Sequence, residues 1–108
     1  MFRRVSLLLL LGLGVGVLMA FAAGQSHVIT QKDKAFSAAD LTVKAGDTVV
    51  FKNEDDVTHN VFSQTPGFVF NSKTQAPGAE TSALFDKAGT VDVRCAIHPK
   101  MKLTINVQ

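Results

Sequence analysis

The carboxyl-terminal part of the chain carries three side chains that bind soft metal ions. Cys95, His98 and Met101 present a thiolate, an imidazole and a thioether at steps of three residues, which one tight loop can curl around a single point. A second imidazole must come from elsewhere in the chain, and His59 is the candidate. Two histidines, one cysteine and a weakly bound methionine make up the trigonal blue-copper site, whereas zinc sites seldom use thioether sulfur. The sequence therefore predicts one copper ion held by His59, Cys95, His98 and Met101.

Each of these residues has an ordinary structural explanation when it is taken singly. A lone cysteine is commonly a small buried hydrophobe, a lone histidine a structural residue, and a methionine beside an apolar strand part of the core. Four such coincidences in one short domain would be needed to explain the whole set. A metal site explains all four residues at once, and it is the interpretation that we adopt.

The first 23 residues have the pattern of a secretory signal peptide. Arg3 and Arg4 give a positive start, residues 5–21 form an apolar run, and small residues surround Ala22, the expected cleavage point. We therefore expect residues 24–108 to form one exported domain in the periplasm, or a membrane-anchored domain if the apolar run stays uncleaved. A single cysteine in an oxidising compartment is a liability unless something occupies its sulfur.

Outside this leader the charges balance. The formal charge of +2 comes from Arg3 and Arg4, because the rest of the chain has nine basic and nine acidic residues. A neutral domain gives no reason to expect nucleic acid or an anionic membrane as a partner. About 85 residues are enough for a modest core without disulfide bonds.

After Gln25 the chain consists of short β-rich runs separated by turns. Strands are predicted at residues 27–30, 41–44, 48–52, 57–63, 81–86, 90–95 and 102–107. Residues 64–78 are expected to form a loop, in which residues 68–70 have the composition of a strand. None of these segments has a convincing helical period. The pattern predicts an all-β fold, a small β-sandwich.

The alternation of side chains along a strand predicts that the donor atoms face the core. Cys95 is in phase with Val93, and Met101 is in phase with the apolar residues of the last strand. His59 shares its phase with Val61. Phase predicts the direction of these side chains, and the fold must bring them together.

The sequence at these positions resembles the cupredoxin family. The resemblance rests on residues 41–53, 59–61 and 85–101, and it covers nearly all of the chain after the leader. It is greatest to the plastocyanin, pseudoazurin and amicyanin group, and the short Cys-x-x-His-x-x-Met loop is most similar to that of amicyanin. The resemblance implies a Greek-key β-sandwich with a type 1 copper site.

The resemblance also implies a role for each residue of the site. Cys95 would be the covalent thiolate ligand, His59 and His98 would complete the trigonal plane, and Met101 would lie at longer range. The backbone amide of Asn60 would donate a hydrogen bond to the cysteine sulfur and tune the reduction potential. His98 would lie near the surface within an apolar patch, through which electrons enter or leave.

The function expected from the resemblance is single-electron transfer by a monomer that cycles between Cu(I) and Cu(II). Its partners would be redox proteins, such as a c-type cytochrome, a dehydrogenase, or an oxidase or reductase. The alternative is a periplasmic copper-binding or trafficking module that uses the same ligands without shuttling electrons. We expect no enzyme activity and no small-molecule substrate, because the inward-facing Cys95 leaves little room for one. Copper enzymes also need additional histidines, and two of the three in this chain belong to the predicted site.

Two further features stay open in the sequence. Glu54, Asp55 and Asp56 form either a solvated loop or an acidic docking patch for a basic redox partner. His27 is expected to be solvated. If cleavage fell after Gly24, however, His27 would stand third from a free amine and would complete a square-planar Cu(II) or Ni(II) site.

Overall fold

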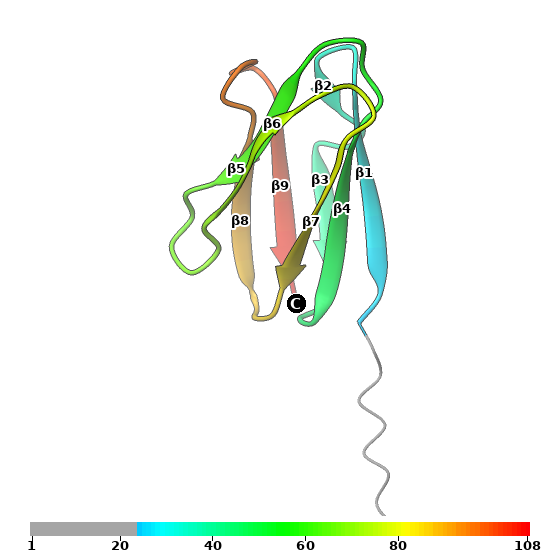
Figure 1. Cartoon of the computed structure of the whole chain (residues 1–108). Coiled ribbons are helices and arrows are strands. Elements are labelled where there is room, and N and C mark those ends of the chain that lie inside the picture. The colour runs from blue at the N-terminus through cyan, green and yellow to red at the C-terminus, as the bar shows by residue number, and fades with distance from the viewer. Residues whose placement is uncertain (1–23) are drawn as a thin grey trace, which may run out of the picture.

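Residues 24–108, the part of the chain that the computed structural model describes, form two β-sheets packed face to face (Figure 1). The signal peptide predicted for residues 1–23 lies outside the described residues. One sheet has four strands in the order β2-β1-β4-β7, and the other has five in the order β3-β9-β8-β5-β6. The strands are β1 (Ser26–Lys32), β2 (Ala35–Phe36), β3 (Asp40–Val43), β4 (Asp47–Asn53), β5 (His59–Ser63), β6 (Phe70–Gln75), β7 (Glu80–Phe85), β8 (Gly89–Arg94) and β9 (Lys102–Val107).

The strands pair mostly antiparallel, and two parallel pairs join segments that are distant in the sequence. β1 runs parallel to β4, and β3 runs parallel to β9. The chain therefore crosses repeatedly from one sheet to the other, which closes a sandwich and confirms the predicted all-β fold. Residues 24–108 contain no helix that is long and apolar enough to span a membrane.

Side chains that alternate along the strands fill the space between the sheets. In β4, Val49 and Phe51 are completely buried, and in β9 Leu103 and Ile105 are completely buried, while their neighbours in the sequence are partly exposed. The remaining apolar core comes from the other strands in the same way. Removing this apolar surface from water is the main force that holds the two sheets together.

The prediction of a loop over residues 64–78 is wrong at its centre, because residues 70–75 form strand β6. β6 pairs with β5 at the edge of its sheet, and the pairing is irregular, with a register shift near Asn60 and a positive φ of 59° at Lys73. Its sequence, FNSKTQ, lacks apolar alternation because most of its side chains are solvated. Two side chains of β6 do face inward: Gln75 is 1% exposed, and the partly buried ring of Phe70 stacks on that of Phe51, with 5.9 Å between centroids.

One strand boundary and one additional strand also differ from the prediction. β5 begins at His59 and not at residue 57, and the two-residue strand β2 has no counterpart among the predicted strands. β2 forms a tight hairpin with β1, in which Asp33 and Lys34 both have positive φ. A pairing of two residues is too short to leave a periodic pattern in the sequence.

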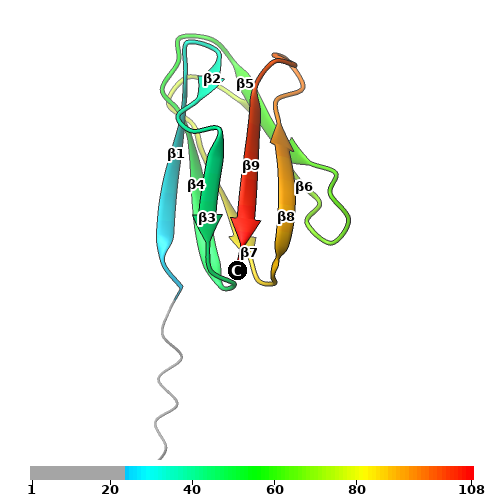
Figure 2. The same ribbon diagram turned by 180° about the vertical axis from the view of Figure 1, so that it is seen from behind.

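Most connections between strands gather at the two ends of the sandwich, whereas the β5–β6 connection projects from its side (Figures 1 and 2). The upper end in Figure 1 carries the β1–β2 turn, the β4–β5 loop, the β6–β7 turn and the β8–β9 loop. The lower end carries the β3–β4 turn, the β7–β8 turn and the carboxyl terminus. The predicted ligand loop and the predicted ligand at the start of β5 therefore share the upper end.

A single carboxylate organises the lower end. Asp47 is 4% exposed, and its Oδ1 accepts a hydrogen bond from the Gln25 backbone amide at 2.8 Å. Its Oδ2 accepts hydrogen bonds from the Lys44 amide at 2.9 Å and from Nε2 of His27 at 2.8 Å. The Lys44 amide first, and His27 next, lower the pKa of Asp47 from 3.8 to about 2.

We expect Asp47→Asn to lower the free energy of unfolding of the metal-free protein at about pH 7, and we expect its deficit relative to wild type to shrink in acid. Because the folded-state pKa is depressed, the stabilisation is fully present above 3.8 and is lost as the pH falls through about 2. Urea unfolding of both proteins at several pH values from about 7 down to about 2 measures the deficit in the free energy of unfolding. Asp86→Asn, at an exposed position, is the matched control. A deficit that stays constant down to about pH 2 would contradict the assignment.

Candidate metal centre

The loop that carries three of the predicted ligands is closed by the strands on either side of it. β8 and β9 remain paired up to the two residues that flank 95–101, which brings the ends of this seven-residue loop together. Within the loop, the Met101 amide donates a hydrogen bond to the His98 carbonyl at 3.0 Å. Cys95 and Met101 are each 2% exposed, as their phase with the apolar strand residues predicted.

His59 reaches the same end of the sandwich from another strand. It is the first residue of β5, and it is completely buried. The loop before it is shaped by Asn53, whose Nδ2 donates to the Val57 carbonyl at 3.0 Å and whose Oδ1 accepts the Asp55 amide at 2.9 Å. Such side-chain bonds to the backbone replace the ladder of a strand, so they determine where β5 begins.

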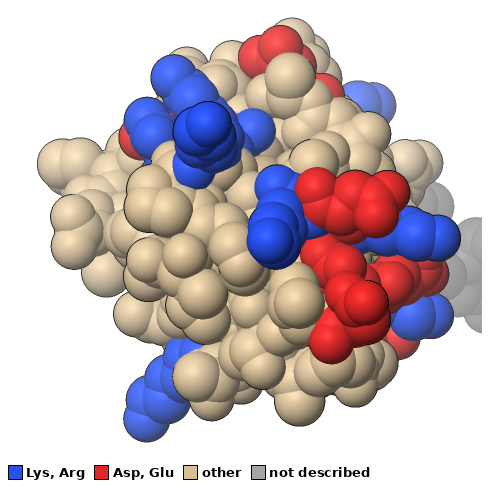
Figure 3. Space-filling view, turned by 90° about the horizontal axis from the view of Figure 1, so that it is seen from above, with Lys and Arg blue, Asp and Glu red and all other residues tan. Residues whose placement is uncertain are grey.

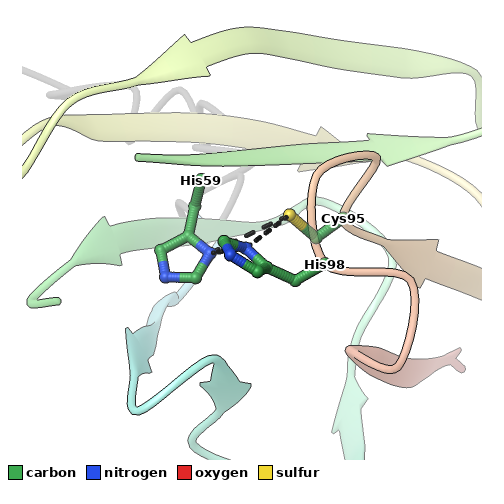
Figure 4. Close-up of side chains that lie close together, drawn as sticks. All are labelled: His59, Cys95 and His98. Atoms are coloured by element: carbon green, nitrogen blue, oxygen red, sulfur yellow. Dashed lines mark hydrogen bonds between the residues drawn. The ribbon is translucent and has the colours of Figure 1, made fainter. Parts of the chain in front are cut away.

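The donor atoms of His59, Cys95 and His98 face one another (Figure 4). The Cys95 sulfur lies 3.9 Å from Nδ1 of His59 and 3.9 Å from Nδ1 of His98, and the two Nδ1 atoms are 3.2 Å apart. The structure therefore brings together three of the four residues that the sequence predicted as ligands. Met101 is buried at the end of the same loop.

This triangle has the dimensions of a metal site. A triangle with sides of 3.2, 3.9 and 3.9 Å has a circumradius of about 2.1 Å, so a point in its plane lies about 2.1 Å from every donor. Bonds from zinc to imidazole and thiolate are about 2.0–2.1 and about 2.3 Å long. The two Nδ1 atoms at 3.2 Å form a hydrogen bond when one of them carries a hydrogen, and a cation bound by both nitrogens takes the place of that hydrogen. Imidazole and thiolate donors in this arrangement fit copper.

The second ring nitrogen of His59 is bound to a carboxylate. Nε2 lies 2.8 Å from Oδ2 of Asp55, and the two side chains are 0% and 7% exposed. The same oxygen accepts the Lys34 backbone amide at 2.9 Å. The Lys34 amide first, and His59 next, hold the pKa of Asp55 well below its usual value. Asp55 is therefore ionised at neutral pH, and His59 donates its Nε2 hydrogen to it.

The acidic segment 54–56 is consequently divided between the inside and the outside of the protein. Glu54 and Asp56 are exposed, whereas the Asp55 side chain is buried against His59. This burial rules out a docking patch made of all three residues, because only Glu54 and Asp56 are exposed. Sequence reasoning missed the inward role of Asp55, for which the four-residue spacing to His59 was the only signal.

Asn60 joins the ligand loop to the edge of the sheet. Its backbone amide donates to the Cys95 sulfur at 3.4 Å, the contact that the family resemblance implied. Its side-chain Nδ2 donates to Oδ1 of Asn71 at 2.9 Å and to the Lys73 carbonyl at 3.1 Å, and its Oδ1 accepts the Ala96 amide at 3.4 Å. Hydrogen bonds of this kind hold a metal ligand in place and tune its electron density.

His98 lies at the surface of the upper end. It lines a shallow hollow together with Lys34, Ile97, Pro99 and Lys100, and Ile97 is 46% exposed. Seen from above, uncharged surface occupies much of this end, and acidic and basic side chains adjoin one another at one side of it (Figure 3). Of the three converging residues, His98 is therefore the one that a partner can approach.

His27 lies at the other end of the sandwich, away from the three converging donors. It belongs to β1, where Ser26 and His27 stand opposite Thr48 and Val49 of β4, and its Nε2 is bound to Asp47. A square-planar site of the kind considered above would need the backbone at these two residues to leave the sheet. The residue is also half-buried and not fully solvated as expected.

The comparisons with known proteins agree with this geometry. Residues 23–108 match the family described as copper binding proteins, plastocyanin/azurin family. The methylamine utilization protein MauL of Methylorubrum extorquens is 31% identical over 87 residues, which are 80% of this chain and 76% of that protein. MauL of Methylophilus methylotrophus is 29% identical over 85 residues, which are 76% of this chain, and the chain spans about half (49%) of the length of that relative.

A solved structure shows the same fold. A reduced variant of amicyanin superposes with a TM-score of 0.71 at 28% sequence identity, over 77% of this chain and 82% of that one. The family match covers all of the residues that form the sandwich and the donor triangle. This chain therefore belongs to the plastocyanin/azurin family of copper-binding proteins, the cupredoxins, as its sequence predicted.

Proposed function

We propose that this protein is a type 1 copper protein that shuttles single electrons between redox partners in the periplasm. His59, Cys95 and His98 would hold the copper ion through two imidazole nitrogens and a thiolate, and Met101 would add a weaker thioether ligand. The observation that carries the proposal is the triangle of two Nδ1 atoms and one sulfur with sides of 3.2 and 3.9 Å. A donor set of this kind is typical of electron-transfer copper sites.

Bound copper supplies the exchange of one electron between Cu(I) and Cu(II). The residues of the chain hold the ligand side chains in place and keep water away from them. His59 and Cys95 are buried. The Asp55 carboxylate holds His59 through a hydrogen bond, and the Asn60 backbone amide donates one to the Cys95 sulfur. Donors that stay in place in both charge states keep the reorganisation energy small, which favours fast transfer.

The route to a partner runs through the exposed ligand. The edge of the His98 ring, with Ile97 and Pro99 beside it, offers an apolar contact from which a partner excludes water. Glu54 and Asp56 add negative charge to the β4–β5 loop at the same end, which steers the encounter. A c-type cytochrome, a dehydrogenase, or an oxidase or reductase fits such a surface. The names of the relatives make a protein of methylamine utilization the first partner to test.

Cys95→Ser is expected to abolish the intense visible absorption of the Cu(II) protein, because the thiolate is the covalent donor. Met101→Leu is expected to keep both copper and colour and to raise the reduction potential, because only a weak ligand is lost. Visible and paramagnetic-resonance spectra after addition of Cu(II), followed by voltammetry, measure these effects. Ala96→Ser adds the same hydroxyl one residue away and should stay blue. A blue Cys95→Ser protein would mean that the ligand assignment is wrong.

Ile97→Glu is expected to slow electron exchange with a redox partner at least about tenfold, since a charge replaces the apolar contact beside His98. Its visible spectrum should not change. Leu84→Glu is the matched control, because Leu84 is 64% exposed on β7, outside the upper end. Stopped-flow mixing with a reduced c-type cytochrome measures the rate. Equal rates of electron exchange for the two variants would contradict a docking surface at Ile97. Loss of copper to a Cu(I) acceptor faster than electron exchange would favour copper trafficking.

A further inference from the structure

Asp55 is the acidic residue of segment 54–56 that the docking surface does not use. Its Oδ2 lies 2.8 Å from Nε2 of His59, and neither side chain is open to solvent. An ionised carboxylate has no hydrogen to donate, so the hydrogen in this bond belongs to the ring. A neutral imidazole with its hydrogen on Nε2 has its lone pair on Nδ1. Nδ1 is the atom that faces Cys95 and His98.

The Asp55 carboxylate is held by its own hydrogen bonds. The Lys34 amide donates to Oδ2 at 2.9 Å, and the Asp56 amide donates to Oδ1 at 3.0 Å. The Lys34 amide comes from the tight β1–β2 turn, where Asp33 and Lys34 have φ values of 53° and 56°. These hydrogen bonds fix the orientation of the carboxylate. Because the ring of His59 is bound to the same carboxylate, its orientation is fixed as well.

We propose that Asp55 is a positioning residue of the copper site. It selects the Nε2–H tautomer of His59, aims Nδ1 at the other two donors, and stabilises Cu(II) relative to Cu(I) through its negative charge. Carboxylates that accept a hydrogen bond from a metal-bound histidine orient the ring and raise its basicity. The part that concerns copper rests on the proposed function, whereas the tautomer of His59 is a property of the metal-free chain.

The redox effect follows from the charge on the ion. A nearby negative charge attracts Cu(II) more strongly than Cu(I), and the low dielectric around two buried side chains strengthens that attraction. Loss of the charge should therefore weaken Cu(II) binding more than Cu(I) binding. A differential loss of tenfold corresponds to a rise of about 59 mV in the potential of a one-electron couple.

Three variants separate the contributions of Asp55. Asp55→Ala removes both carboxylate oxygens and the charge. Asp55→Asn keeps a side chain of the same length and one acceptor oxygen, removes the charge, and replaces the other oxygen with an NH2 donor. Asp56→Asn is the matched control, because it removes the same charge from the exposed neighbour.

The first experiment uses metal-free protein. Nitrogen-15 NMR at about pH 8, above the ordinary histidine pKa of about 6.5, reports which ring nitrogen of His59 carries the hydrogen. We expect the Nε2–H form alone in wild type and in Asp56→Asn, and a mixture with the Nδ1–H form in Asp55→Ala. An unchanged tautomer in folded Asp55→Ala would overturn the positioning role.

The second experiment uses the copper-loaded protein. We expect Asp55→Ala to lose about 10–100-fold in Cu(II) affinity, and we expect a higher reduction potential in both Asp55 variants than in Asp56→Asn. If Asp55→Ala does not fold, the potential of Asp55→Asn decides alone. Potentials equal to that of Asp56→Asn would overturn the inference and leave electron transfer intact. A wild-type chain that binds no copper would instead overturn the proposed function, and the tautomer measurement would still judge Asp55.

Discussion

Two imidazole nitrogens face each other at 3.2 Å with a sulfur 3.9 Å from each, and the upper end of the sandwich is built to hold them there. The three side chains stay in this arrangement because each is held by its surroundings. The Asp55 carboxylate holds His59, the Asn60 amide holds the Cys95 sulfur, and the closed β8–β9 loop carries His98. The protein thus imposes the geometry, and the ion enters a site whose shape is already set.

The sandwich separates this site from the contacts that stabilise its other end. The upper end collects the β1–β2, β4–β5 and β8–β9 connections, whereas Asp47 ties the first strand to the β3–β4 turn at the lower end. A core that includes Phe51, Phe70 and Phe85 lies between them. The irregular edge strand β6 belongs to both regions, because Phe70 packs in the core while the hydrogen bonds of Asn60 tie β6 to β5 beside the ligands.

The β4–β5 loop shows how neighbouring residues take opposite roles when no strand imposes alternation. Asn53 shapes the loop, Asp55 turns inward to His59, and Glu54 and Asp56 remain in solvent. Three acidic residues that look equivalent in the sequence therefore differ in their chemistry. Because Lys34 contributes its amide to Asp55 and lines the hollow beside His98, the β1–β2 turn contacts both the inner and the outer side of the site.

By itself the sequence determined the all-β class and the inward direction of His59, Cys95 and Met101, and it predicted the donor set. These follow from residue types and from alternation with a period of two, which are local properties. Only the tertiary structure decided that residues 70–75 form a strand. These residues have no strand pattern of their own, and they become β6 because they pair with the free edge of β5. It also decided that His59 meets Cys95 and that the Lys34 amide holds Asp55, since those contacts join residues that lie 36 and 21 positions apart and leave no trace in either segment alone.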